Sequence, residues 1–390
     1  MKKNASILTV YLTTALATTM ATAQVANAEV TLNLNGYITQ SYIYSPDNPY
    51  ADDRSAKQGS FDFRTIGLYL NAPITNNFQI NLLGLSNKFG ELSDGEPRLE
   101  IAELQYTYFG VNHETGIKLG RSITPYGFFN QTRLVSGITP GSSLPTSVYF
   151  TGIEDIMLSN DGLNLFGQAF TSAGLVDWDI YYGSHQTQND TFEFQLTRGN
   201  GNTDGFDRIE KQGIRIFFIP DALYNLEVGL SYLKLSTDTN LIIIETPRIT
   251  ETLKIDISNY LLSLAYKKDN ITYRTEVLKA YTAVDVGALG NFNIESIGYY
   301  GQIEWQFADQ FIAYATYEHY VRDEDAKKTP DNKFDAIHAD LRWLATRNLN
   351  LTGGISFYDG YGQIPFYENL DFENLKKTSW LYRINLNYSF

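Results

Sequence analysis

Charged residues at alternating positions are the part of this 390-residue sequence whose types and spacing could do chemistry. In segments with a two-residue period, each of them stands opposite an apolar face. A ring of such charges around an enclosed space would sort ions by sign, because Lys and Arg favour anions while Asp and Glu favour cations. The basic residues placed inward by this rule are Lys118, Arg215, Arg274, Arg342 and Arg383, and the acidic ones are Asp177, Asp179, Glu227, Glu276, Glu304, Glu318 and Asp340.

This inward set is mixed in sign, which predicts a transverse field across the enclosed space and weak net selectivity. Arg121 and Arg133 add two cations, one before and one within a long connection at about 123–160. The competing interpretation is that each charge belongs to an ion pair that only braces the wall. Arg274 with Glu276 and Arg342 with Asp340 have a spacing that allows such pairs.

The four histidines are the other residues that could do chemistry, and they point only weakly to hydrolysis. His338 and Asp340 stand two residues apart on one predicted strand face, so they could touch. No Gly-x-Ser-x-Gly elbow or similar nucleophile motif accompanies them. Cysteine is absent, which excludes thiolate metal sites, and nothing in the sequence predicts a metal or another cofactor.

A two-residue hydrophobic period dominates the chain after its first thirty residues. It is clearest at the C-terminus, where Trp380, Tyr382, Ile384, Leu386, Tyr388 and Phe390 share one face and polar residues the other. Such alternation predicts β-strands with one apolar and one polar side. The sixteen predicted strands span about 30–43, 59–72, 77–87, 98–110, 114–122, 161–172, 175–185, 210–219, 225–236, 254–267, 270–283, 296–307, 310–322, 333–345, 348–359 and 377–390.

The connections between these strands alternate between short and long. The long ones are expected at about 44–58, 88–97, 123–160, 186–209, 237–253, 284–295, 323–332 and 360–376. This alternation is typical of an all-β, antiparallel up-and-down barrel that crosses a membrane, with short turns at one rim and long loops at the other. The alternative is a secreted soluble sheet protein, but its outer faces should be rich in Lys, Glu and Thr rather than in Asn, Gln, Gly and Tyr.

The N-terminus predicts export. Residues 1–28 have the cationic, apolar and small-x-small order of a signal peptide, with cleavage after Ala28, or alternatively after Ala23. A single barrel domain would then occupy 29–390. The whole chain has a net charge of -14, and loss of Lys2 and Lys3 makes it -16, which argues against nucleic acid as a partner.

Two segments carry a resemblance to a known family. The ending Trp380-Leu-Tyr-Arg-Ile-Asn-Leu-Asn-Tyr-Ser-Phe390 resembles the insertion signal of bacterial outer-membrane proteins that the barrel-assembly machinery reads. The stretch from Gly116 to Arg121, with Thr124 to Arg133, resembles the fifth strand and constriction loop of Gram-negative porins. It is most similar to gammaproteobacterial porins related to the phosphate-selective and dicarboxylate-type group. Gln131 and Leu134 stand where that group usually has acidic residues, so the resemblance does not extend to the anion specificity of that group, and the ion preference stays open.

The resemblance implies a passive outer-membrane channel, usually a homotrimer, in contact with lipid and lipopolysaccharide. The long connection at about 123–160 is rich in apolar residues and poor in charge, so we expect it to fold inward and narrow the channel. Packing at the rim or at a subunit contact is the alternative. The other loops carry acidic residues at Asp47, Asp52, Asp53, Asp323, Glu324, Asp325, Glu368, Asp371 and Glu373. We expect these carboxylates simply to be solvated. The alternative is that divalent cations bridge them to phosphates of lipopolysaccharide.

Two further functions remain open from the sequence alone. One is an outer-membrane barrel enzyme, most simply a hydrolase, and the other is a structural or adhesion barrel without an open channel. The solute, the sign of ion preference and the oligomeric state are not specified by any motif.

Overall fold

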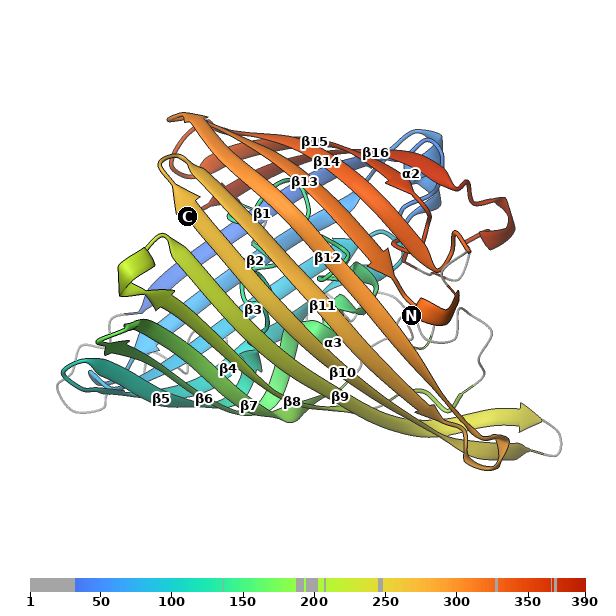
Figure 1. Ribbon diagram of the computed structural model, residues 1–390, viewed down its shortest axis with the longest axis horizontal. Coiled ribbons are helices and arrows are strands. Elements are labelled where there is room, and N and C mark those ends of the chain that lie inside the picture. Colours follow the sequence, from blue (N-terminus) through green and yellow to red (C-terminus); the bar gives the residue numbers. More distant parts are fainter. Residues whose placement is uncertain are drawn as a thin grey trace, which may run out of the picture.

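A computed structural model describes residues 32–390 except 136, 187–192, 194–202, 207, 245–247, 327–328, 366 and 368–369. The predicted signal peptide and Glu368 therefore lie outside the described residues. In the described part, sixteen strands pair in chain order, each antiparallel to the next, and β1 pairs with β16 to close a barrel (Figure 1). The predicted fold class and strand number are confirmed.

The strands of the first half are β1 (Asn33–Tyr44), β2 (Ser60–Pro73), β3 (Phe78–Phe89), β4 (Ser93–Phe109), β5 (His113–Ile123), β6 (Ser159–Thr171), β7 (Gly174–Gln186) and β8 (Arg208–Pro220). Those of the second half are β9 (Leu226–Ile244), β10 (Ile249–Lys268), β11 (Ile271–Asp285), β12 (Asn291–Ala308), β13 (Phe311–Val321), β14 (Lys333–Leu344), β15 (Leu349–Asp359) and β16 (Thr378–Ser389). Short helical pieces are α2 (Asp53–Lys57), η1 (Thr151–Ile153), α3 (Glu154–Leu158), η2 (Asp221–Leu223), η3 (Gly287–Leu289), η4 (Glu324–Ala326) and η5 (Phe372–Asn374). No helix of the described part is long and apolar enough to cross a membrane.

The strands turn an apolar face outward, and most of them turn a polar face toward the barrel interior, although β9 to β11 also carry inward apolar residues such as Leu233, Leu261 and Leu278. On β16, Ile384 and Leu386 are half exposed on the outside, whereas Asn385 and Asn387 are buried inside. The inward residues are buried because other parts of the chain fill much of the enclosed space. Strand alternation therefore sets the direction of each side chain, as the sequence period predicts.

Several strand ends differ from the sequence prediction. β4 begins at Ser93, so the expected long connection at 88–97 is a turn of three residues, 90–92. β9 and β10 continue to Ile244 and from Ile249, across most of the predicted loop at 237–253. These extensions are rich in Thr, which favours strands, and they lack the one-sided apolar pattern by which strands were recognised.

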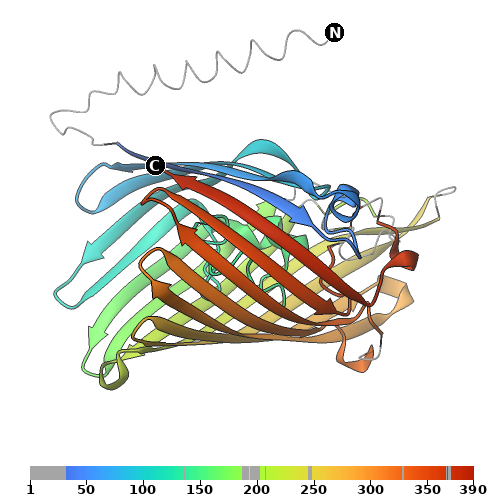
Figure 2. The same cartoon turned by 90° about the horizontal axis from the view of Figure 1, so that it is seen from above.

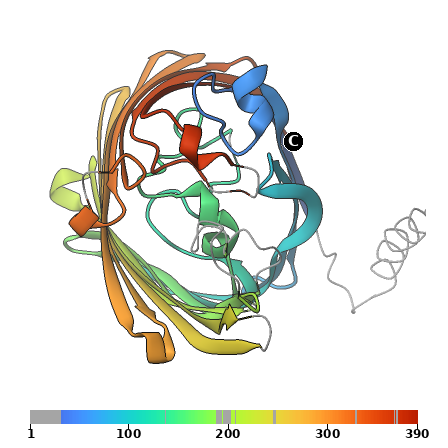
Figure 3. The same cartoon turned by 90° about the vertical axis from the view of Figure 1, so that its right-hand side faces the viewer.

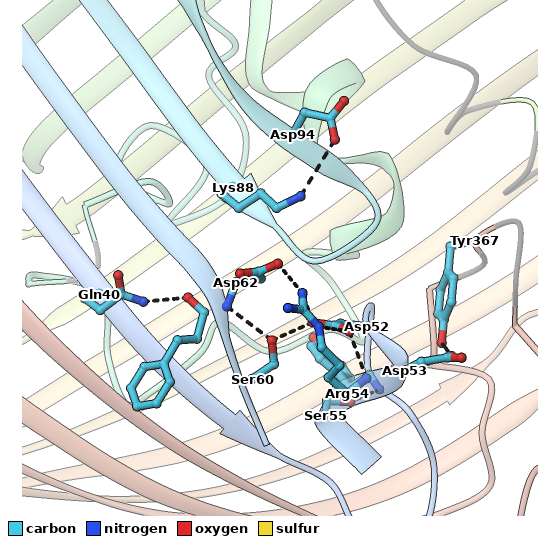
Figure 4. Close-up of polar contacts among 12 residues, drawn as sticks. Gln40, Asp52, Asp53, Arg54, Ser55, Ser60, Asp62, Lys88, Asp94 and Tyr367 are labelled. Atoms are coloured by element: carbon cyan, nitrogen blue, oxygen red, sulfur yellow. Dashed lines mark hydrogen bonds and ion pairs between the residues drawn. The ribbon is translucent and has the colours of Figure 1, made fainter. Parts of the chain in front are cut away.

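The loop that follows β1 is fastened to its neighbours by two acidic residues, Asp52 and Asp53 (Figure 4). The Asp52 carboxylate caps α2 by accepting from the Arg54 backbone N–H at 2.8 Å, and it accepts from the Ser60 hydroxyl at 2.5 Å. Burial alone would raise the pKa of Asp52, but the hydrogen bonds from Ser60 and Arg54 bring it below its ordinary value. Asp53 accepts from the Tyr367 hydroxyl at 2.7 Å. Asp52 and Asp53 therefore hold the loop in place through hydrogen bonds, whereas the sequence led us to expect that they are simply solvated.

The seam between β1 and β16 uses the last residue of the chain. Gly36 and Phe390 exchange two backbone hydrogen bonds of 2.9 Å, at the end of the barrel that carries the short connections (Figure 2). The Phe390 ring covers Gly36, because a Cβ there would lie 2.3 Å from the ring. An aromatic ring over a glycine is one way in which sheets stabilise an edge pairing.

We expect Gly36→Val to displace this ring and weaken closure, with a loss within the ordinary range of about 0.5–3 kcal/mol for single substitutions. The measurement is the temperature at which the folded barrel converts to the unfolded band on an SDS gel. Gly301→Val on β12 is the matched control, since a Cβ there meets nothing within 4 Å. An equal fall in both variants would contradict the role of the ring.

Candidate functional site

The segment 124–158, between β5 and β6, is the longest connection within the described residues, and Figure 3 shows it in green within the ring of strands. It ends in η1 and α3. Its apolar residues Tyr126, Val148, Tyr149, Ile156 and Met157 are buried against inward residues of β7 to β12. Backbone groups along the segment then bond to charged and polar side chains of distant strands.

Glu276 on β11 is the most connected of these wall residues. Its carboxylate accepts from the Phe128 backbone N–H at 3.1 Å, the Tyr149 hydroxyl at 2.6 Å, the Tyr300 hydroxyl at 2.9 Å and the Ser263 hydroxyl at 2.5 Å. Burial raises the pKa of Tyr149 well above its usual range, and the Glu276 charge acts in the same direction. The Tyr149 hydroxyl therefore stays protonated as a donor, and the carboxylate is fully enclosed.

Gly127 allows the segment to approach this wall. Its backbone has φ +56°, a left-handed conformation that glycine adopts without strain, and an added Cβ would lie 2.3 Å from the Tyr149 hydroxyl oxygen. The Gly127 N–H donates to the Ser231 hydroxyl at 3.1 Å, and its carbonyl accepts from Arg215 at 3.3 Å. Two neighbouring strands, β8 and β9, thus hold one turn of the segment.

The middle of the segment is held by β14 and β16. Arg342 donates to the Thr139 carbonyl at 2.6 Å and to the Gly141 carbonyl at 3.0 Å. The Ser142 N–H donates to Asp340 at 3.2 Å, and its carbonyl accepts from Arg383 at 3.3 Å and from Asn385 at 2.7 Å. The pattern is electrostatically consistent, since cations meet carbonyls and carboxylates meet N–H groups.

Glu318 on β13 belongs to a buried chain of three side chains. Its carboxylate accepts from the Ser147 N–H at 2.8 Å and lies 2.7 Å from His338 Nε2, while His338 Nδ1 lies 2.7 Å from the Ser356 hydroxyl. A Ser-His-carboxylate order resembles a hydrolase triad in spacing. However, Ser356 is only 3% exposed and does not line the cavities of about 100 and 320 Å³ beside the described part of the segment. The observed contacts make this chain a support for the segment at Ser147.

The end of the segment has its own anchors. Lys211, buried on β8, donates to the carbonyls of Ile156 and Ser159. Arg133 pairs with Glu154 at 3.2 Å and donates to the Asn130 side chain at 3.2 Å, so it braces the segment internally.

Several of the remaining predicted wall charges pair across strands. Arg215 lies 2.9 Å from Asp179 and 3.5 Å from Asp177, Arg274 lies 2.6 Å from Glu304, and Lys118 lies 3.8 Å from Glu103. Arg274 therefore pairs with the neighbouring strand, and Glu276, its expected partner, bonds to the segment instead. Arg274 stands opposite Gln302, so Glu304 is its diagonal neighbour on β12, a distance that long side chains can span.

Arg121 is placed differently from the other predicted residues. It forms a two-pronged ion pair with Asp161 on β6, at 2.6 and 2.7 Å, and donates to the Leu99 carbonyl. Strand alternation puts Arg121 on the outward face of β5, which it shares with exposed Leu119, whereas Lys118 is on the inward face. The expectation that it sits at the narrowing is therefore corrected, because three residues from an inward lysine is an outward position.

Sequence reasoning missed several residues that contact the segment, chiefly Lys211, Ser231 and Asn385. Their inward direction could have been found from strand parity, since each occupies the polar face of a predicted strand. Which inward residues reach the segment depends on the path of the segment across the barrel, which no local pattern encodes.

Cavities lie on two sides of the described part of the segment. One of about 100 Å³ lies toward β1, β2, β3 and β16 and is lined by residues that include Thr39, Asn87, Arg133, Glu154 and Arg383. The other, about 320 Å³, lies toward β9 to β13. The segment thus divides the enclosed space.

Neither models of protein families nor curated proteins gave a match to this chain. Solved structures do match over nearly the whole barrel. The trimer form of OmpT, an outer membrane protein of Vibrio cholerae, has 11% identity, covers 92% of this chain and 99% of its own, and has a TM-score of 0.56. For the anion-selective porin from Comamonas acidovorans the values are 13%, 93%, 100% and 0.55, and for the outer membrane channel DcaP of Acinetobacter baumannii they are 11%, 94%, 99% and 0.54. At such identities the likeness is one of fold, and the chain has the closed β-barrel fold of Gram-negative outer-membrane porins.

Proposed function

We propose that the protein is an outer-membrane porin, a passive diffusion channel for small hydrophilic or ionic solutes that the 124–158 segment narrows. The observation that carries this proposal is the attachment of that segment, through Glu276, Arg342, Asp340, Glu318 and Arg383, to inward side chains of four strands. A segment tied to several parts of the wall reduces the free cross-section while leaving gaps beside it.

The outer surface of the barrel suits lipid. Its exposed apolar residues form a belt, and aromatic residues stand near both ends of the strands, for example Tyr44 with Tyr382 and Tyr388 with Phe390. Such aromatic girdles mark the two membrane interfaces of transmembrane barrels. Closure pairs every strand edge, which a strand protein in lipid requires.

The partners proposed with this function are outer-membrane lipid, lipopolysaccharide, the barrel-assembly machinery through Phe390, and two further copies of the chain. The trimer form of the matched Vibrio cholerae protein supports the last of these. Export with removal of residues 1–28 belongs to the same proposal.

Reconstitution of the purified protein in planar bilayers tests the channel. We expect stepwise, ohmic conductance in KCl, with a reversal potential in a salt gradient that reports weak selectivity, since inward charges of both signs are interspersed. The control is the same preparation unfolded by heat. A folded protein that gives no conductance steps would contradict the channel and favour a barrel without an open path.

A further inference from the structure

A row of amide side chains crosses the interior wall of the barrel near the rim with the short connections. Its members are Asn33 on β1, Asn71 on β2, Asn81 on β3 and Gln105 on β4, which lie at facing or diagonal positions of neighbouring strands. They point inward, because exposed apolar residues such as Leu34 alternate with them on the outer face. Neighbouring strands stand about 4.8 Å apart, so this amide row is roughly 14 Å long.

Hydrogen bonds fix the order of the amides. Asn33 Nδ2 donates to Asn71 Oδ1 at 3.2 Å, and Asn71 Nδ2 donates to Asn81 Oδ1 at 2.8 Å. Asn81 Nδ2 donates to Gln105 Oε1 at 3.3 Å, and Gln105 Nε2 donates to Thr107 Oγ1 at 3.0 Å. Within the row each donor therefore lies one strand before its acceptor, and bonds in such a chain polarise one another.

Part of the amide row stays accessible to a solute. Asn33 is exposed, and Asn71 and Gln105 are half-buried. A side-chain amide has two N–H groups and an oxygen with two lone pairs, so each of these three keeps a donor and an acceptor position beyond its bonds within the wall. Asn35, the next inward residue of β1, is also exposed and has no side-chain hydrogen bond to another described residue.

The charge beside the amide row is balanced. The Glu103 carboxylate accepts from Asn81 Nδ2 at 2.9 Å and lies 3.8 Å from the Lys118 ammonium group. An ionic solute is held by uncompensated opposite charge, which the described side chains of this stretch do not offer. A hydroxyl group both donates and accepts, as an amide does, so the row is complementary to a solute that carries several hydroxyls.

We propose that the amide row, together with Asn35, binds a neutral polyhydroxylated solute such as an oligosaccharide on its way through the channel. Water forms the same bonds one at a time, so affinity requires a solute that meets several amides at once. The fixed order of the row reduces the entropy lost in that contact. The proposal rests on the proposed channel function and adds to it a class of solute.

Binding of raffinose, a neutral trisaccharide, to the purified barrel in lipid nanodiscs tests this surface. Saturation-transfer NMR across a raffinose titration gives the dissociation constant. We expect saturable binding to the wild type that weakens at least about fivefold in Asn35→Leu with Asn71→Leu, since the hydrogen bonds of two amides are lost. Asn35→Leu alone keeps the three bonds within the row and should weaken binding by a smaller factor.

Gln168→Leu is the matched control for these variants. Gln168 is an inward amide of β6 that stands between Glu114 and Asp177, away from the amide row. It should bind raffinose like the wild type. The melting temperature of each variant verifies folding. Absence of saturable binding to the wild type, or equal weakening in Gln168→Leu and in the Asn35 variants, would overturn the role of the row.

Two further probes test the class of solute. Polyethylene glycol of similar mass lacks hydroxyls along its length, and citrate carries charge, so neither should compete with raffinose. Competition by polyethylene glycol would show that the surface does not recognise hydroxyls. Competition by citrate at lower concentration than unlabelled raffinose would replace the neutral class by an anionic one and overturn the proposal.

Conductance, measured separately, keeps this proposal distinct from the channel. A protein that conducts but does not bind raffinose retains the channel and overturns the binding surface. A protein that binds raffinose with the expected order of variants, but does not conduct, sustains the binding surface and overturns the channel.

Discussion

Replacement of Glu276 by alanine is expected to release the 124–158 segment from β11 and to give larger, noisier single-channel currents. The carboxylate is the shared acceptor for Phe128 N–H and for the hydroxyls of Tyr149, Tyr300 and Ser263. Each buried donor left without an acceptor costs about 1–3 kcal/mol, so the barrel should also melt at a lower temperature. Conductance in planar bilayers and the heat-conversion temperature on SDS gels measure the two effects.

Graded variants separate anchoring from charge in this experiment. Tyr149→Phe removes one of the four bonds and should have a smaller effect in the same direction. Glu227→Ala is the matched control, because Glu227 is an inward carboxylate of β9 without a hydrogen bond to the described part of the segment. Wild-type currents in Glu276→Ala, or equally noisy currents in Glu227→Ala, would show that this anchor does not set the width of the channel.

Replacement of Arg342 by alanine should alter both ion preference and segment order. Loss of an inward cation shifts the reversal potential toward cation preference. Arg342 also donates to the Thr139 and Gly141 carbonyls, and hydrogen bonds to charged groups are worth about 1.5–3 kcal/mol each. We therefore expect a shifted reversal potential together with added current noise and faster protease cleavage within the segment.

Arg274→Ala is the comparison that divides these two effects. Arg274 pairs with Glu304 and faces the Phe129 ring, so its loss removes the same charge but no bond to a segment carbonyl. It should shift the reversal potential without added noise. Equal noise in both variants would contradict the anchoring role of Arg342, and unchanged reversal potentials in both would remove these residues from the ion path.

Strand identity was readable from the sequence wherever a strand has one apolar and one polar side. The alternation from Trp380 to Phe390 predicts β16 within one residue of its observed start, because only one register turns every apolar side chain outward. The predicted ends of β9 and β10 are wrong because the outer parts of these strands lack this one-sided pattern. The backbone hydrogen bonds there depend instead on pairing with a neighbouring strand. The wrong placement of Arg121 has a different cause. Counting alternate residues from inward Lys118 already puts Arg121 on the outward face, so the sequence itself contained this information.

The candidate site was predictable only in part. The apolar composition of 123–160 led to the expectation of an inward fold, and strand parity correctly points Glu276 and Arg342 toward the interior. That Glu276 would hold Phe128, 148 residues away along the chain, follows from no spacing rule. Nor does the sequence indicate that Arg274 pairs with Glu304 rather than with Glu276.

The sequence by itself determined the number of strands, their antiparallel order, the direction of most side chains and the class of the fold. These properties follow from local periodicity, because each apolar face must be covered and each backbone edge must be paired. Only the tertiary structure decided which inward side chains hold the segment, which charges pair across strands, and where a largely apolar cavity remains. Those outcomes depend on distances between residues far apart in the chain, which barrel closure sets and no local pattern contains.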